Sequence, residues 1–261
     1  MRFIYPQSFL TPRLPDEIFQ DEAIALAKAG HIVTLIDSDK LSTEPAILKA
    51  ITPETTVVYR GWMLSPTEYK NLVLSIKKAG GLPLNSTEKY LATHYLPHWY
   101  PIISDLTPET VILSLDSDWI SELRKLGWSN FFVKDYVKSL KTSIGSLIES
   151  PEDIQTVVAE MKKYRGTIEG GLCIRRVEDF LLETEQRYFV LKGKPYGINP
   201  KDKIPEIVFE CAKRINSQFF SVDLIHRRDG QLRIVEIGDG QVSDLVGWSV
   251  QRFIDMWETS T

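Results

Sequence analysis

The stretch SVDLIHRRDGQLRIVEIGDG, residues 221–240, decides the fold, because two apolar runs flank an Asp-Gly pair in it. Asp-Gly between apolar runs is a strong signal for a β-hairpin, since both residues tolerate positive φ. A two-residue turn would pair Arg228 with Gln231. Carried back along the strands, that register places Asp223 directly opposite Glu236, on the same face of the hairpin. The sequence therefore predicts two adjacent carboxylates within an otherwise apolar hairpin.

Two like charges placed opposite each other destabilise a sheet, so something must offset their repulsion. A divalent cation does so, and a ligand set of oxygen atoms alone favours Mg²⁺ over zinc. Mg²⁺ takes one or two carboxylates and then phosphate oxygens, which indicates a nucleotide. Two alternatives remain open: one carboxylate is protonated, or the carboxylates pair with Arg227 or Arg233. A register slip of one residue would also separate the pair.

The first third of the chain alternates between strand and helix patterns. We expect strands at residues 2–5, 31–37 and 55–61, and helices at 15–30 and 65–81. Ser65 and Glu68 form a capping box that begins the second helix, and Pro66 suits its first position. Strands that alternate with helices predict a parallel sheet, at whose carboxyl edge ligands bind.

Arg60 lies at that edge, at the end of an apolar strand, and is a candidate for binding an anionic substrate group. A structural salt bridge is the equal alternative for this residue. The loop after the first strand, residues 6–14, has no glycine, which excludes the phosphate-binding turn of a dinucleotide-binding unit.

The rest of the chain continues with mixed elements, whose expected ranges follow from the apolar periodicity. A helical stretch is expected at 86–104, a Thr-Pro boundary at 107–108, and a strand that begins near Asn130. A helix at 150–166, strands at 170–180 and 185–197, a helix at 204–215 and a last helix from about Asp244 complete the expected elements.

The composition places the protein among ordinary globular proteins and excludes several classes. A net charge of −4 argues against a broad nucleic-acid-binding face, and two cysteines imply no disulfide framework. No apolar run is long enough to span a bilayer, and the N-terminus lacks the apolar core of a signal peptide, so we expect a cytoplasmic protein without a membrane partner.

Three motifs, in chain order, resemble those of the ATP-grasp superfamily. They are FFVK at 131–134, EQRYFV at 185–190, and the hairpin that contains VEI at 235–237. The resemblance covers about residues 107–261, and the signatures VVYRGWM, FVKDYVKS and VEIGDGQVS are similar to those of an ATP-grasp clade related to amino-acid and peptide ligases. It implies an N-terminal α/β pre-ATP-grasp domain at 1–106, followed by a two-lobed α+β ATP-grasp domain at 107–261, with lobes of about 107–170 and 171–261.

The resemblance also implies roles for single residues, with ATP and Mg²⁺ as cofactors. Asp223 and Glu236 would bind Mg²⁺, and Arg187 would face the γ-phosphate or the acyl phosphate that it becomes. The nucleotide-binding candidates are Lys134 for the α- and β-phosphates, Arg176 and Val177 for the adenine, and Glu185 for the ribose or the adenine rim.

Two departures from the family pattern add further candidates. The glycine-rich flap is replaced by DYVKSLKT, residues 135–142, where Lys138 and Lys141 would supply charge in place of backbone N–H groups. The usual asparagine after the metal-binding glutamate is Gly238, and Asp239 next to it is a candidate metal ligand.

The resemblance implies an ADP-forming ligase that activates a carboxylate as an acyl phosphate and joins it to an amine. The partners would be small-molecule or peptide carboxylates and amines. Two alternatives stay open: an ATP-dependent phosphotransferase that acts on another acceptor, and a regulatory module that binds Mg-ATP without chemistry.

Overall fold

A computed structural model describes residues 1–137, 139 and 145–259 of the chain, which divide into two compact units. Unit 1 comprises residues 1–93, 186–222 and 238–261, and unit 2 comprises 94–185 and 223–237. The domain ranges expected from the sequence, 1–106 and 107–261, are continuous, whereas the two units interleave along the chain. Those ranges stay a prediction.

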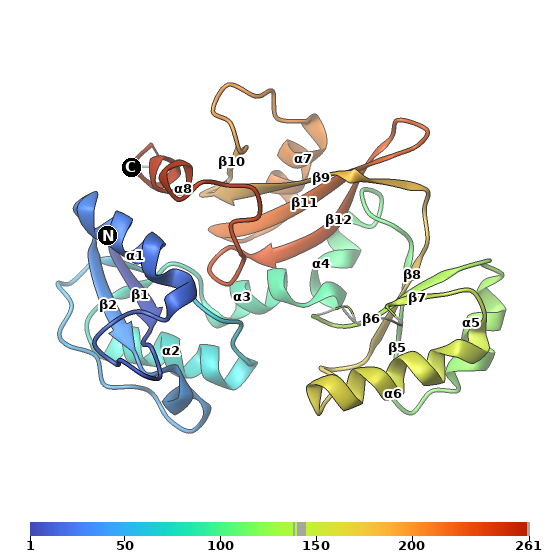
Figure 1. The fold of residues 1–261 in the computed structure, drawn as a ribbon, viewed down its shortest axis with the longest axis horizontal. Helices are drawn as coiled ribbons and strands as arrows, with labels where there is room; N and C mark the ends of the chain where they lie inside the picture. Colours follow the sequence, from blue (N-terminus) through green and yellow to red (C-terminus); the bar gives the residue numbers. More distant parts are fainter. Residues whose placement is uncertain (138, 140–144, 260–261) are drawn as a thin grey trace. The chain divides into compact units, whose positions relative to one another are not determined.

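Unit 1 contains a four-stranded sheet in the order β2-β1-β3-β4, and all of its pairings are parallel. Its strands are β1 (Arg2–Pro6), β2 (Ile32–Ile36), β3 (Thr56–Tyr59) and β4 (Leu82–Pro83), shown in blue and cyan in Figure 1. Two helices alternate with them, α1 (Gln20–Lys28) and α2 (Pro66–Lys78). The predicted α/β class with an N-terminal parallel sheet is confirmed.

The capping box predicted for α2 is present. The Ser65 hydroxyl accepts a hydrogen bond from the Glu68 N–H, and the Glu68 carboxylate accepts one from the Ser65 N–H. Pro66 occupies the first turn, where its missing N–H has no cost. Three neighbouring residues thus determine where this helix begins.

Unit 2 contains an antiparallel sheet in the order β5-β8-β6-β7. Its strands are β5 (Thr110–Leu113), β8 (Leu172–Arg176), β6 (Phe131–Asp135) and β7 (Leu147–Ile148). The helices α5 (Trp119–Leu126) and α6 (Ile154–Arg165) lie in the same unit, and α6 follows a short 3-10 helix, Pro151–Asp153, that Ser150 caps. We did not predict β5 and α5, because both are short and directly follow the Thr-Pro boundary.

The third sheet has the order β10-β9-β11-β12, and the boundary between the units crosses three of its strands. The strands are β10 (Lys194–Tyr196), β9 (Phe180–Leu191), β11 (Phe219–Arg227) and β12 (Leu232–Asp239). The remaining helices are α3 (Thr87–His94), α4 (Leu96–Ile103), α7 (Glu206–Arg214) and α8 (Val250–Glu258). The last helix begins at Val250 and not near Asp244, because Gly247 takes a positive φ of 77° and Ser249 caps the helix.

The hairpin turn between β11 and β12 differs from the predicted two-residue turn. The Arg227 N–H donates to the Gln231 carbonyl at 2.8 Å, and the Gly230 N–H donates to the Arg227 carbonyl at 2.9 Å. Three residues therefore lie between the closing pair, and Gly230 takes the left-handed conformation that such a turn with a bulge requires. The two-residue turn was wrong, because Asp-Gly also suits this longer turn.

The far end of the same hairpin has a different register. Gly240 donates to the Phe219 carbonyl at 3.1 Å, which fits the register that we predicted from the sequence. β12 therefore accommodates one extra residue between its two ends, and its buried isoleucines, Ile234 and Ile237, are three residues apart instead of two. Direct opposition of the two hairpin carboxylates stays a prediction.

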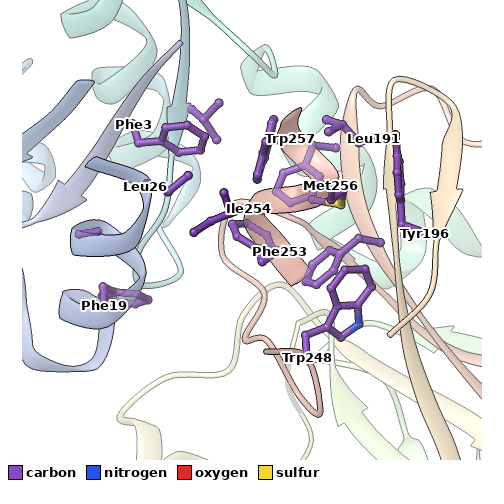
Figure 2. Packing of buried hydrophobic residues seen from close by; sticks show 14 of the residues in the cluster. Phe3, Phe19, Leu26, Leu191, Tyr196, Trp248, Phe253, Ile254, Met256 and Trp257 are labelled. Atoms are coloured by element: carbon purple, nitrogen blue, oxygen red, sulfur yellow. The ribbon is translucent and has the colours of Figure 1, made fainter. Parts of the chain in front are cut away.

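A cluster rich in aromatic side chains forms one hydrophobic core of unit 1 (Figure 2). Trp257 on α8 packs edge-on against Phe3 of β1 and Phe219 of β11, with ring centroids 5.3 and 4.9 Å apart. Phe253, one turn earlier on α8, packs against Phe189 of β9 at 5.7 Å. The amphipathic last helix thus supplies large side chains that bring three separate parts of the sequence into one core.

No helix in the described part of the chain has the length and apolar character that crossing a membrane requires.

We expect Phe253→Ala to lower the free energy of unfolding by about 3–5 kcal/mol, because it empties a fully buried site. Phe209→Ala is the comparison, since Phe209 is 38% exposed and buries less apolar surface, so it should cost clearly less. Urea denaturation followed by circular dichroism measures both. Equal losses in the two variants would contradict the assignment of the core.

Candidate functional site

The side chain of Lys134 is buried in unit 2, where β6 lies between β7 and β8. In the β6–β8 register Lys134 lies opposite Cys173. Its ammonium group is 3.4 Å from Oε1 of Glu236 on β12, whose side chain is 46% exposed. The structure thus brings together two of the residues predicted for the site.

Asp223 on β11 belongs to the same unit as Glu236 and is buried. Among the residues that the structure describes, no group of three or more His, Cys, Asp or Glu side chains could hold a metal ion. Two carboxylates fit Mg²⁺ nevertheless, because this ion takes one or two carboxylates and completes its shell with water and phosphate oxygens. Asp223 and Glu236 would hold the ion, which would neutralise phosphate charge when bound.

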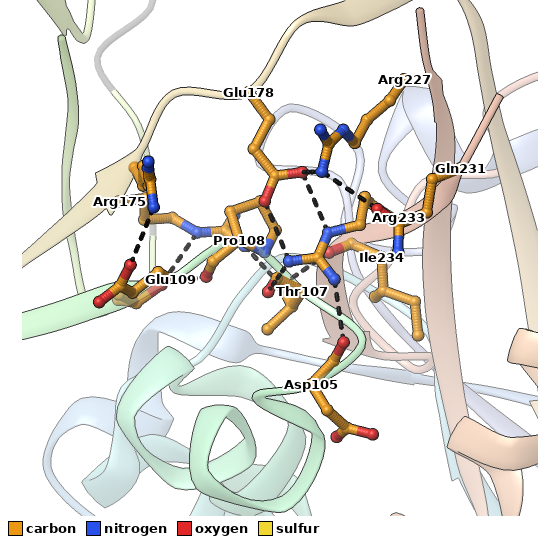
Figure 3. Close-up of polar contacts among 12 residues, drawn as sticks. Asp105, Thr107, Pro108, Glu109, Arg175, Glu178, Arg227, Gln231, Arg233 and Ile234 are labelled. Carbon is orange, nitrogen blue, oxygen red and sulfur yellow. Dashed lines mark hydrogen bonds and ion pairs between the residues drawn. The ribbon is translucent and has the colours of Figure 1, made fainter. Parts of the chain in front are cut away.

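The two arginines that were alternative partners of the hairpin carboxylates are bound elsewhere. Arg233 forms a two-point ion pair with Glu178, at 3.0 and 2.9 Å, and Arg227 lies 3.5 Å from the same carboxylate (Figure 3). Arg233 also donates to the carbonyls of Asp105 and Thr107. This network ties the segment between β8 and β9 to β12 within unit 2.

Arg175, at the end of β8, is buried beside this network. It donates to the Val235 carbonyl at 2.5 Å and to the Thr107 hydroxyl at 2.6 Å. Burial lowers the pKa of the Arg175 guanidinium to about 10. The backbone carbonyl next to Glu236 is therefore fixed by a buried cation, a contact that the sequence did not predict.

The residues predicted to contact the adenine and the ribose lie on β8, on β9 and in the segment that joins these strands. Arg176 is exposed and lies 3.5 Å from Glu109, Val177 is partly buried, and Glu185 on β9 is exposed. Their roles toward adenine and ribose stay predictions. Lys138 and Lys141 lie outside the described residues, so their roles stay predictions as well.

Arg187 belongs to unit 1 and is partly buried. Its guanidinium donates to the Asp244 carbonyl at 2.9 Å, and its own carbonyl accepts from the Trp248 indole at 3.0 Å. Its role toward the γ-phosphate stays a prediction.

Arg60 is bound within unit 1 rather than open to an anion. It is 2% exposed and forms a two-point ion pair with Glu22 of α1, with both distances 2.8 Å. Its Nη1 donates to the carbonyls of Gly240 and Ser243, and its guanidinium carbon lies 4.7 Å from the centroid of the Phe253 ring. These contacts match the structural salt bridge, the alternative that the sequence left open.

Asp239 is fully buried at the end of β12, in unit 1. One carboxylate oxygen accepts from the Asn85 amide at 2.7 Å, and the other accepts from the Gln241 N–H and side-chain amide, both at 3.0 Å. Burial raises the pKa of the Asp239 carboxyl to about 7, although the hydrogen bonds from Gln241 and Asn85 act to lower it. Both oxygens already have amide donors, so we restrict the proposed metal ligands to the two carboxylates of unit 2.

Asn85 and Gln241 are the residues of this network that sequence reasoning missed. Gln241 also donates to the Tyr69 hydroxyl at 2.6 Å, and Asn85 donates to the Phe219 carbonyl at 3.1 Å. Gln241 is part of the signature GDGQVS, which could have drawn attention to it, whereas no pattern around Asn85 would have done so.

Comparison with protein families identifies the chain. Residues 125–256, half of its length, match the model of the ATP-grasp domain, R2K clade family 3. The chain belongs to this family. No match was found among the curated proteins.

Solved ATP-grasp structures share the fold of this R2K-clade chain across its whole length. The ATP-grasp ligase PsnB, complexed with a phosphomimetic variant of its minimal precursor, Mg and ADP, has a TM-score of 0.63 at 12% identity, over 98% of this chain and 96% of that one. The macrocyclase MdnC from Microcystis aeruginosa MRC, bound with the precursor peptide MdnA, has a TM-score of 0.61 at 14% identity over the whole of both chains. The D-cycloserine synthetase DcsG has a TM-score of 0.63 at 11% identity, over 100% and 99%. At such low identities, the structural similarity shows the ATP-grasp fold alone.

We expect Arg60→Met to lower the free energy of unfolding of this ATP-grasp protein by about 3–5 kcal/mol, because it leaves the Glu22 carboxylate buried without its partner. Arg228→Met is the control: Arg228 pairs with Asp179 at 3.1 Å, both side chains are more than two-thirds exposed, and the change should cost at most about 1 kcal/mol. Urea denaturation measures both. If Arg60→Met leaves the free energy of unfolding unchanged, the ion pair is not structural and Arg60 is again a candidate for binding the substrate.

The buried carboxyl of Asp239 should make stability depend on pH. Its pKa of about 7 in the folded protein exceeds the value of roughly 3.9 in an unfolded chain, so folding favours proton uptake between these values. The free energy of unfolding should therefore contain a component that falls as pH rises from about 4 to about 7, and is constant above that. Asp239→Asn should remove this component, whereas Asp21→Asn, at an exposed position, should keep it. If the free energy of unfolding changes with pH in the same way in the wild type and in Asp239→Asn, the raised pKa of Asp239 is contradicted.

Proposed function

We propose that this protein is an ADP-forming ATP-grasp ligase that joins a carboxylate to an amine. Membership of the ATP-grasp family supports the use of ATP, and a structural neighbour with Mg and ADP supports Mg²⁺. The neighbours that are ligases or synthetases support the reaction class. PsnB and MdnC were both solved with a precursor peptide bound, so peptides are one candidate substrate class for this chain.

The observation that carries the proposal is the contact between Lys134 and Glu236. A buried lysine must have a counter-charge, and here the counter-charge is the hairpin glutamate 3.4 Å away. In the proposed complex Lys134 would hold phosphate oxygens, while Glu236 and Asp223 would hold Mg²⁺. One contact thus joins the residue proposed for the phosphates to a residue proposed for the metal.

The proposed chemistry has two steps. A carboxylate oxygen of the substrate attacks the γ-phosphorus of ATP, which forms an acyl phosphate and releases ADP. A neutral amine then attacks the acyl carbon and expels phosphate, and the amide nitrogen loses a proton. The residues contribute charge neutralisation and positioning, with Arg187 proposed for the transferred phosphoryl group.

Nucleotide binding tests the site directly. We expect a non-hydrolysable ATP analogue to bind the wild type only with Mg²⁺, and Glu236→Gln to lose that dependence. Lys134→Met should weaken binding by about 10- to 100-fold, since a hydrogen bond to a charged group is worth about 1.5–3 kcal/mol. Isothermal titration calorimetry measures these affinities.

Two matched controls come from an exposed pair in unit 2. Lys125 and Glu122 lie 2.6 Å apart on α5, and Lys125→Met and Glu122→Gln should leave nucleotide affinity unchanged. If no nucleotide binds the wild type at any Mg²⁺ concentration, the proposed function is wrong.

Turnover then separates the reaction classes. Release of ADP that requires both a carboxylate and an amine supports the ligase. Release of ADP with a single non-carboxylate acceptor indicates a phosphotransferase instead, and Mg-dependent binding with no ADP release across the substrate panel indicates a regulatory module.

A further inference from the structure

The carboxyl edge of the parallel sheet in unit 1 contains a cavity of about 350 Å³ that no step above uses. Eight residues from the segments that follow β1, β2 and β3 line it: Pro6, Gln7, Phe9, Asp16, Asp37, Ser38, Asp39 and Trp62. All eight belong to unit 1. Its position is the one where ligands bind in parallel α/β sheets, and its volume suits a small molecule or a single side chain.

Backbone hydrogen bonds hold the floor of the cavity. The Gln7 N–H donates to the Ile36 carbonyl at 2.9 Å, which extends the pairing of β1 with β2 by one residue. The Asp16 N–H donates to the Pro6 carbonyl, also at 2.9 Å, so the loop between these residues closes on itself. Asp16 and Asp37 each precede a short 3-10 helix, and these helix starts determine where the two carboxylates lie.

Trp62 lines the cavity with its indole ring, whose orientation its contacts fix. Its indole N–H donates to Asp16 at 3.1 Å, its carbonyl accepts from the Tyr59 hydroxyl at 3.1 Å, and its ring packs edge-on against Phe19 at 5.3 Å. Gly61 permits this arrangement, since a Cβ there would lie 2.4 Å from the Tyr59 hydroxyl. Trp62 is nevertheless 45% exposed, so one part of its surface is free to contact a ligand.

The cavity has an excess of negative charge. Asp37 lies 3.1 Å from Lys40, whose side chain is 66% exposed. Among the residues that the structure describes, Asp16 accepts hydrogen bonds from two uncharged donors, the Trp62 indole and the Ile18 N–H, and pairs with no cation. Asp39 has no hydrogen-bond or ion-pair partner for its side chain among the described residues. Two of the three carboxylates thus lack a cationic partner in this part of the chain. Phosphates and carboxylates would be repelled.

Carboxylates beside exposed aromatic rings form an environment that favours organic cations. The face of an indole ring attracts ammonium and guanidinium groups, and apolar stems pack against such rings. Phe9, which is 88% exposed, adds a second aromatic surface at the rim.

We propose that this cavity binds a cationic anchor group of the substrate, an alkylammonium or guanidinium with an apolar stem. The inference rests on the proposed ligase function and names one chemical feature of its substrate. The anchored group is not the reacting amine, because an ammonium kept charged by carboxylates has no lone pair with which to attack an acyl phosphate. The substrate would therefore have both a reacting group and a separate cation.

The test compares charged and neutral probes on the full chain without nucleotide. The probes are cadaverine, N-acetyl-lysine methylamide, and the neutral N-acetyl-norleucine methylamide. The readout is the NMR shift of the Trp62 indole N–H, assigned by its loss in Trp62→Phe. We expect both cationic probes to shift this resonance and the neutral probe to bind at least about tenfold more weakly. Equal binding of the lysine and norleucine probes would overturn the inference on the wild-type protein alone.

Variants then test whether the carboxylates of the cavity attract the cationic probe. Asp37→Asn combined with Asp39→Asn should weaken the lysine probe by about tenfold, whereas Asp21→Asn, at an exposed position outside the cavity, should leave it unchanged. Unchanged affinity in the double variant overturns the inference. Tighter binding of the lysine probe than of cadaverine indicates a basic side chain of a peptide as the source of the cation. The reverse order indicates a free amine.

The probe binding, taken together with the turnover assay for ADP release, separates this inference from the proposed function. Cation-selective binding in a protein that releases no ADP supports the cavity and rejects the ligase. Substrate-dependent release of ADP, together with equal binding of the charged and neutral probes, supports the ligase and rejects the cavity.

Discussion

Unit 1 depends on one buried cation, the guanidinium of Arg60. It leaves the end of β3, pairs with Glu22 on α1, and donates to the carbonyls of Gly240 and Ser243 beyond β12. A buried charge is tolerated only when its hydrogen-bonding groups are satisfied, so this single side chain requires a residue 38 positions earlier and a loop 180 positions later to meet it. The ring of Phe253 then packs over the guanidinium and links the same point to the aromatic core of α8. The return of the C-terminal part of the chain to the N-terminal sheet follows from that requirement.

The buried carboxylate of Asp239 imposes the same requirement at the end of the hairpin. Its oxygens need donors, and Asn85 and Gln241 supply them, while Gln241 continues the network to Tyr69 on α2. The polar residues at the end of β12 and directly after it therefore hold this segment in place within unit 1. Glu236, only three residues earlier on the same strand, belongs to unit 2 and contacts Lys134. The signature VEIGDGQVS thus contains Glu236, which contacts Lys134 in unit 2, and also Asp239 and Gln241, which belong to the buried network of unit 1.

Local rules in the sequence predicted what depends on neighbouring residues. Ser65 and Glu68 were enough to begin α2, and the alternation of strands and helices was enough for the parallel sheet. Asp-Gly indicated the hairpin but not its length, because that pair serves two turn types that differ by one residue. The partner of Arg60 could not be predicted, since nothing in the local sequence links it to Glu22. Glu236 was singled out by the hairpin register and Lys134 by a family resemblance, but nothing in the local sequence predicted the contact between these two residues, 102 positions apart.

In the described part of the chain, two ion pairs contain a buried cation that was predicted for the site, and they differ in a way that bears on function. Arg60 and Glu22 are 2% and 6% exposed and meet at two points, so separating them would strand two charges. The Lys134 side chain is also buried, but its partner Glu236 is 46% exposed. The two side chains meet through a single contact of 3.4 Å, which is longer than either contact between Arg60 and Glu22. Water can replace the lysine at Glu236 at little cost, and a phosphate can replace the glutamate at Lys134 without leaving the lysine uncompensated. If Mg-ATP binds as proposed, each member exchanges one ionic partner for another, and the desolvation of the lysine has already been met during folding. A weak, half-exposed pair at this position is therefore what an exchangeable nucleotide site requires, whereas the pair at Arg60 suits only a permanent structural contact.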